Sequence, residues 1–194
     1  MAARVGLDRG RVVDVAVELV ERGAAGESPV LAEVAARLGV RTQSLYAHVN
    51  GVEDLRRELA LRGLRALTAR LTGAAVGRAG TDALDAIARA WLSFAGEHPG
   101  LYAASLRAPG QDPELREAVA AAMAPLQAVF RSWGLADDDA AHWYRTIFAA
   151  VHGFATLRSG GMFTLPVDVD ETATRMIGMF VRGVERDARP RRAR

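Results

Sequence analysis

Apolar residues recur at spacings of three and four along almost the whole chain, and no stretch alternates apolar and polar residues between turn signals. A spacing of three and four places apolar side chains on one face of an α-helix, where they can pack against other helices. The pattern therefore predicts an all-α protein of about nine helices.

The first part of the chain carries clear signals for helix ends. Asp8 can cap a first helix, and Ser28 followed by Pro29 can open a second. Gly39 suits the end of the second helix because glycine readily adopts the left-handed conformation, and Gly51 interrupts the chain before a longer helix. The four helices expected from these signals span residues 8–22, 28–38, 42–49 and 52–71.

The domain organisation follows from chain length and from one small, Gly-rich segment. A chain of 194 residues has room for one ordinary domain, or for a head of roughly 50 residues and a body of roughly 130. The Gly-rich segment at 72–80 predicts a boundary or a kink between such a head and body. We assign residues 1–65 to the head, 66–189 to the body and 190–194 to a basic tail that we expect to be disordered.

Five helices are expected in the body. Helix breakers and caps place them at residues 81–97, 101–106, 113–133, 137–158 and 170–186. Pro125 falls inside the third of these ranges, and a proline inside a helix removes one backbone hydrogen bond. The sequence therefore predicts a kink or a break at that position.

Composition places the protein among soluble globular chains. Hydrophobic residues make up 50% of it and charged residues 25%, and the absence of cysteine excludes disulfides, thiol nucleophiles and cysteine metal sites. The N-terminus lacks the apolar core of a signal peptide, and the longest uncharged stretch, residues 118–130, is too short to span a bilayer. We therefore expect a cytoplasmic protein without a membrane partner.

The distribution of charge identifies no partner. The net charge is only +2, and residues 182–194 carry six arginines against two acidic residues. Such a basic tail could contact nucleic acid, or it could be a solvated chain end, and both interpretations remain open at this stage. A nucleic-acid partner must therefore be argued from a motif.

Residues that could support catalysis or bind a metal are not gathered in the sequence. An enzyme would need a nucleophile beside a base, a phosphate-binding loop or a metal cluster, and none of these patterns is present. The four histidines, His48, His98, His142 and His152, have no metal-ligand spacing. We expect a protein that is not an enzyme, with no catalytic residues, metal or cofactor.

The most informative segment is residues 39–55, with the sequence GVRTQSLYAHVNGVEDL, together with the preceding PVLAEVAARL. A short helix, a Gly-containing turn and a second short helix form a helix-turn-helix, whose second helix fits the major groove of DNA. The order Gly-Val, polar residues, Leu-Tyr-x-His-Val and an acidic pair before Leu resembles the DNA-binding head of the tetracycline-repressor (TetR) family. The resemblance covers about residues 12–64.

This resemblance implies roles for individual side chains. Four residues at the start of the second helix would read base edges, and two others would contact phosphates, as would the N-terminus of the next helix at Val52. Val52 replaces a lysine that is common in the family, so phosphate binding would depend more on Arg56 and Arg57. The base-reading candidates are Arg41, Thr42, Gln43 and Ser44, and the phosphate-binding candidates are Tyr46, His48 and Val52.

The resemblance also implies a body that forms a homodimer and senses a small molecule. The helices near residues 140–157 and 170–186 have wide apolar faces, which can form a four-helix bundle with a second copy or fill the core of a monomer. The candidates for the dimer interface are Phe154, Leu157, Met176 and Phe180.

An apolar set of body residues could line a ligand pocket, although methionine and aromatic residues at helical spacing more often form an ordinary core. The candidates are Trp91, Phe94, Tyr102, Leu106, Met123, Leu126, Phe130, Trp143, Phe148 and His152. The tripeptide Val151-His152-Gly153 is similar to the Trp-His-Gly signature of one TetR subfamily, with Val in place of Trp.

These features predict a transcriptional repressor that binds a palindromic operator in double-stranded DNA and leaves it when a small apolar ligand binds the body. The alternative is a helical protein-interaction module in which the helix-turn-helix is purely structural. Binding of the purified protein to the DNA upstream of its own gene would distinguish the two.

Overall fold

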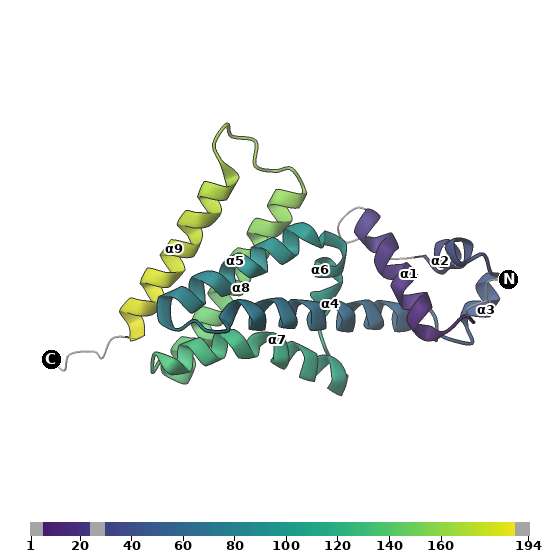
Figure 1. The fold of residues 1–194 in the computed structure, drawn as a ribbon, viewed down its shortest axis with the longest axis horizontal. Helices are drawn as coiled ribbons and strands as arrows, with labels where there is room; N and C mark the ends of the chain where they lie inside the picture. The colour runs from purple at the N-terminus through teal and green to yellow at the C-terminus, as the bar shows by residue number, and fades with distance from the viewer. Residues whose placement is uncertain (1–5, 24–29, 189–194) are drawn as a thin grey trace. The chain divides into compact units, whose positions relative to one another are not determined.

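The computed structural model describes residues 6–23 and 30–188, and every regular element in these ranges is a helix (Figure 1). The helices are α1 (Arg9–Arg22), α2 (Leu31–Leu38), α3 (Thr42–Leu45), α4 (Val52–Ala75), α5 (Gly80–Glu97), α6 (Pro99–Ser105), α7 (Pro113–Ser132), α8 (Asp137–Ser159) and α9 (Val169–Ala188). The predicted all-α class and the approximate number of helices are confirmed for this part of the chain.

Local signals at the helix ends act largely as predicted. The Asp8 carboxylate accepts a hydrogen bond from the Arg11 amide at 2.8 Å and so caps α1. Gly39 ends α2 in the left-handed conformation, with φ of 68°. Ser28 and Pro29, predicted to open α2, lie outside the described residues, and the described helix begins at Leu31.

The structure differs from the sequence-based expectation at the ends of α3 and α4 and at Pro125 in α7. Helix α3 ends at Leu45 instead of Val49, because the following residues form turns in which the His48 and Val49 amides both donate to the Leu45 carbonyl. Helix α4 continues to Ala75, since a single internal glycine costs only about 1 kcal/mol in a helix. Helix α7 is not broken at Pro125, and the residues that follow the proline are held in place by burial.

The described residues form two compact units. One combines the residues up to Arg65 with His98–Ala118, and the other combines Ala66–Glu97 with the residues from Val119 onward. The first unit thus contains α1, α2, α3 and α6 together with the start of α4, and the second contains α5, α8 and α9. Helix α6 was assigned to the body from the sequence, but in the structure it belongs to the first unit, with the helices of the head.

The core of the first unit is made by the apolar faces of α1, α2 and α4 together with the end of the α3 segment. Its most buried members are Val12, Val13, Ala16, Val20, Val34, Ala35, Leu45, Val49, Leu55 and Leu59. These positions follow the spacing of three and four seen in the sequence, so apolar burial accounts for the arrangement.

Helix α6 contacts α1 and α4 through two glycines. A Cβ atom on Gly100 would lie 2.0 Å from the Val20 carbonyl oxygen of α1, and one on Gly63 would lie 2.6 Å from the Leu101 carbonyl oxygen of α6. Both distances are shorter than atoms can approach, so each contact requires a residue without a side chain. In the second unit, α5 packs on both α8 and α9.

Candidate functional site

The segment from Arg41 to Val49 divides its side chains between the core and the surface. Leu45 and Val49 are buried and anchor the segment, whereas Tyr46 is 58% exposed. Arg41, Gln43 and Ser44 are exposed as well, and Thr42 and His48 are partly buried. Side chains that the sequence assigns to base edges and phosphates are therefore accessible, while the apolar residues between them hold the segment in place.

Arg9 connects α1 to both ends of the loop between α3 and α4. Its guanidinium donates to the His48 carbonyl oxygen at 2.8 Å and to the two Asp54 carboxylate oxygens at 2.8 and 2.7 Å. It also donates to Glu58 at 2.9 Å, and Asp54 in turn accepts from the Asn50 amide at 2.8 Å. One arginine thus fixes the backbone near the end of the segment Arg41–Val49, the recognition segment, relative to the start of α4.

The charges in this network stabilise one another. The hydrogen bonds that Arg9 donates to Asp54 and then to Glu58 raise the pKa of its guanidinium, and Arg9 lowers the pKa of the Asp54 carboxyl below its ordinary value. Nothing in the local sequence marks this network, because Arg9 and Asp54 are far apart in the chain and neither belongs to the recognition segment.

We expect Arg9→Met to lower the free energy of unfolding at pH 7 by roughly 1 to 2 kcal/mol, a modest loss because the Arg9 side chain is 41% exposed and partly screened by solvent. Since folding depresses the Asp54 pKa, this contribution is complete above the unfolded value of about 4 and is lost as pH falls below it. Urea denaturation should therefore show a smaller loss of stability between about pH 5 and pH 3 in the variant than in the wild type. Arg11→Met, on the exposed side of α1, is the control, and an unchanged acid dependence in Arg9→Met would contradict the role of this network.

The two arginines expected to assist phosphate binding are paired with acidic residues instead. Arg57 donates to Asp112 at 3.2 Å and to Glu114 at 2.6 Å, and Arg56 pairs with Glu53. The hydrogen bonds that Arg57 donates to Asp112 and then to Glu114 raise the pKa of its guanidinium. Arg57 therefore links α4 to the loop before α7 and does not face solvent as a free cation.

The pocket candidates occupy several environments. Trp91, Phe94, Leu126 and Phe130 are buried in the second unit, and Met123, Trp143, Phe148 and His152 are partly buried there. Tyr102 is buried and Leu106 partly buried in the first unit. The ten candidates are thus spread over both units.

Three side chains on one face of α8 form an aromatic row, namely Tyr144, Phe148 and His152. Their ring centroids are 6.1 and 6.2 Å apart, and each pair of rings is tilted by only 15°. Trp91 of α5 lies beside the middle ring, with its centroid 5.9 Å from that of Phe148. Burial raises the pKa of the Tyr144 hydroxyl. Sequence reasoning named three of these four residues and missed Tyr144.

Trp143 is adjacent to the aromatic row in sequence but lies elsewhere. Its indole N–H donates to Asp187 of α9 at 3.1 Å, and a Cβ atom on Gly183 would lie 2.2 Å from its ring. Trp143 therefore packs against α9, in contrast to the row that faces Trp91.

Comparisons with known proteins agree with this architecture. The family model described as "Tetracyclin repressor-like, C-terminal domain" matches residues 84–180. An uncharacterized HTH-type transcriptional regulator of Mycobacterium tuberculosis (strain ATCC 25618 / H37Rv), Rv0681, is 35% identical over 182 residues, which are 93% of this chain and 83% of the relative. The chain belongs to the TetR family. It is thus a DNA-binding transcriptional regulator of the helix-turn-helix type, as the resemblance in the sequence indicated.

Two further proteins are similar to this chain along most of its length. The regulator YobS of Bacillus subtilis (strain 168) is 31% identical over 186 residues, or 95% of this chain and 96% of the relative. A solved structure of a protein with unknown function from Rhodococcus sp. RHA1 has a TM-score of 0.75 at 28% identity, and it covers 94% of this chain and 98% of that one. The match extends well beyond the helix-turn-helix, so it includes both units of this TetR-family regulator.

The four candidates for the dimer interface differ in exposure. Phe154 and Phe180 are buried in the single chain, with Phe180 only 5% exposed, and Met176 is partly buried. Leu157 is 44% exposed, and Met179, which sequence reasoning missed, is 58% exposed. Of the apolar residues on α8 and α9, Leu157 and Met179 are therefore more accessible to a second copy than the two phenylalanines.

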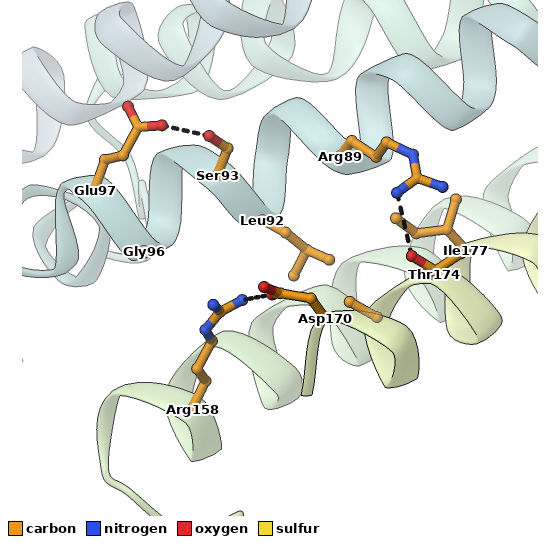
Figure 2. A pocket seen from close by; sticks show the side chains of 10 residues that line it. Arg89, Leu92, Ser93, Gly96, Glu97, Arg158, Asp170, Thr174 and Ile177 are labelled. Atoms are coloured by element: carbon orange, nitrogen blue, oxygen red, sulfur yellow. Dashed lines mark hydrogen bonds and ion pairs between the residues drawn. The ribbon is translucent and has the colours of Figure 1, made fainter. Parts of the chain in front are cut away.

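A groove in the second unit lies between α5, the end of α8 and the start of α9 (Figure 2). Its volume is about 470 Å³, and none of the ten pocket candidates lines it. Arg158 pairs with Asp170 at 2.8 Å, and Arg89 donates to Thr174 at 3.3 Å and pairs with Asp85 (Figure 2 shows the first two contacts). Both arginines that line this groove are thus paired with neighbouring side chains.

Two features are absent from the described ranges. No helix there is long and apolar enough to cross a membrane. Within the same ranges, no three His, Asp or Glu side chains are grouped so that they could hold a metal ion.

Proposed function

We propose that this TetR-family regulator is a repressor, that it binds a palindromic operator as a homodimer, and that a small, largely apolar molecule bound by its second unit releases it. The observation that carries the DNA-binding part is the division of the segment Arg41–Val49 between buried apolar anchors and exposed polar side chains. A recognition segment needs this division, because its base contacts must be both accessible and rigidly placed.

The start of α4 supplies a second contact with DNA. Gly51 adopts a φ of 93°, which sets the chain direction before the helix, and α4 then begins at Val52. The first amides of a helix have no acceptor within it and carry the positive end of the helix dipole, so they can bind a phosphate. Arg9 and Asp54 hold this helix end beside the His48 backbone and so place the two phosphate-binding elements together.

The ligand-binding part of the proposal is supported by the match to the tetracyclin repressor-like C-terminal domain and by the aromatic row within it. Binding can reach the head through α4, because this continuous helix starts in the first unit and ends in the second. A movement of α4 would change the spacing of the two recognition segments of a dimer, which must match about one turn of DNA, 34 to 36 Å.

The ligand must bind the DNA-free state more tightly than the DNA-bound state. Linkage then requires that DNA weaken ligand binding by the same factor, typically 5- to 150-fold. A molecule that binds equally well to the free and the operator-bound protein in calorimetry is not the inducer, whatever its affinity.

Substitutions in the recognition segment test the DNA-binding part. We expect Gln43→Ala to change which DNA sequence is preferred, since a good base contact contributes roughly 1 to 3 kcal/mol of discrimination. Tyr46→Ala and His48→Ala should instead weaken binding to all sequences similarly, because phosphate contacts carry no sequence information. Selection of binding sites from random DNA measures both effects. If Gln43→Ala keeps the wild-type preference, Gln43 does not read bases.

A further inference from the structure

The buried donor on Trp91 distinguishes the surroundings of the aromatic row from an ordinary core. Trp91 is 4% exposed, and its indole Nε1–H has no hydrogen-bond acceptor among the described residues. A buried donor without an acceptor costs free energy, and tryptophans in protein interiors usually satisfy this group. Trp143 does so in the same unit, through Asp187.

The neighbouring rings define the shape that a ligand of this site would have. Tyr144, Phe148 and His152 are each only partly buried, and their nearly parallel rings follow one another along α8. Aromatic rings pack best against other rings, in offset-stacked or edge-to-face arrangements. The Trp91 ring lies against Phe148, the middle ring of the row, with an interplanar angle of 53°.

We propose that the aromatic row and Trp91 together bind a planar aromatic molecule that carries a hydrogen-bond acceptor, such as a ring nitrogen or a carbonyl oxygen, and that Trp91 Nε1–H donates to this acceptor. The inference rests on the proposed function, because it names the class of ligand that the second unit would sense.

Two small probes isolate the hydrogen bond. Quinoline and naphthalene have nearly the same planar shape, but only quinoline has a ring nitrogen that can accept a hydrogen bond. Their dissociation constants are measured by equilibrium dialysis at pH 8 with the full-length wild type, Trp91→Phe and Trp143→Phe. The relevant quantity is the ratio of the two constants within each protein, which removes general differences in hydrophobicity and in packing.

We expect Trp91→Phe to reduce the preference for quinoline over naphthalene by about tenfold, because it removes the donor and retains an aromatic ring. Trp143→Phe should leave the ratio at its wild-type value, since that indole already donates to Asp187. An unchanged ratio in Trp91→Phe, or failure of the folded wild type to bind either probe, would overturn the inference.

A second measurement needs no folded Trp91 variant. In wild-type protein labelled with ¹⁵N, the indole N–H signal of Trp91 should move on addition of quinoline and remain in place with naphthalene. The spectrum of Trp143→Phe identifies the Trp143 indole signal, so that it is not mistaken for the signal of Trp91. Equal shifts with both probes would contradict the hydrogen bond.

Operator binding separates this inference from the proposed function. If quinoline binds as expected but DNA affinity does not change, the site stands and the proposed inducer response loses its support. If an aromatic ligand releases DNA while Trp91→Phe and wild type have the same ratio of quinoline to naphthalene dissociation constants, the inference fails and the proposed function stands.

Discussion

Gly100→Ala should lower the free energy of unfolding by about 2 to 4 kcal/mol, a large change for the addition of one methyl group. The new Cβ atom would lie 2.0 Å from the Val20 carbonyl oxygen, 2.4 Å from the Val20 carbonyl carbon and 2.9 Å from the Glu21 amide nitrogen. These are backbone atoms of α1, which cannot rotate out of the way as a side chain could. The substitution must therefore separate α6 from α1.

A matched glycine provides the control for this prediction. Gly96 also lies in a helix, and a Cβ atom there would meet no atom within 4 Å. Gly96→Ala should leave stability unchanged or raise it by up to about 1 kcal/mol, because alanine loses less backbone entropy on folding. Urea denaturation of the two variants measures the difference. Equal stabilities would show that α6 is not packed closely against α1.

Met179→Arg should convert the proposed dimer to a monomer and weaken operator binding at least about a hundredfold. Met179 is 58% exposed on α9, so an arginine there can be solvated in a single chain and need not disturb its fold. In a twofold-symmetric interface each subunit contributes the same patch, so the substitution brings two like charges into an apolar contact. A monomer also binds the operator more weakly, because a single head contacts one half-site without the second head that a dimer provides.

Light scattering and operator titration test the two parts of this prediction. Val76→Arg is the control, since Val76 is also an exposed apolar residue, 70% exposed, in the turn after α4. It should leave both the mass in solution and the DNA affinity near the wild-type values. A Met179→Arg protein that remains dimeric would place the interface elsewhere on the chain.

Helix positions could be predicted from the sequence because the signals that set them are local. The Asp8 cap, the left-handed Gly39 and the apolar spacing in α1 each act within a few residues. The end of α3 was predicted wrongly because the Leu45 carbonyl accepts two hydrogen bonds from a following turn, which preserves the path of the chain without a regular helix. Pro125 was overestimated as a breaker, because burial after it outweighs the lost hydrogen bond.

Contacts between distant residues could not be predicted. The packing of α6 on α1 depends on the approach of Gly100 to Val20, and neither residue reveals its partner in the sequence. The Arg9 network is hidden for the same reason, since its three acceptors become neighbours only after folding. The Arg9 network holds the His48 backbone, so the sequence predicts DNA-facing residues in the segment Arg41–Val49 without showing what holds that segment.

The two candidate regions differ in how much the sequence reveals. The segment Arg41–Val49 is continuous, so its spacing alone predicts a recognition helix. The aromatic row is brought beside Trp91 by the packing of α5 on α8, and the sequence could not distinguish Trp91 from Trp143. In the structure the first indole is buried without an acceptor among the described residues, and the second donates to Asp187.

Binding of the full-length protein to the DNA upstream of its own gene tests the central claim most directly. The titration should use that duplex and a scrambled duplex of the same length and composition at one stated salt concentration, because phosphate contacts make all DNA affinities salt-dependent. A regulator with a specific operator should bind its own upstream DNA at least about a thousandfold more tightly than the scrambled duplex. Equal affinity for the two duplexes would contradict an operator at this locus, and no binding to either would favour a helical module in which the helix-turn-helix is only structural.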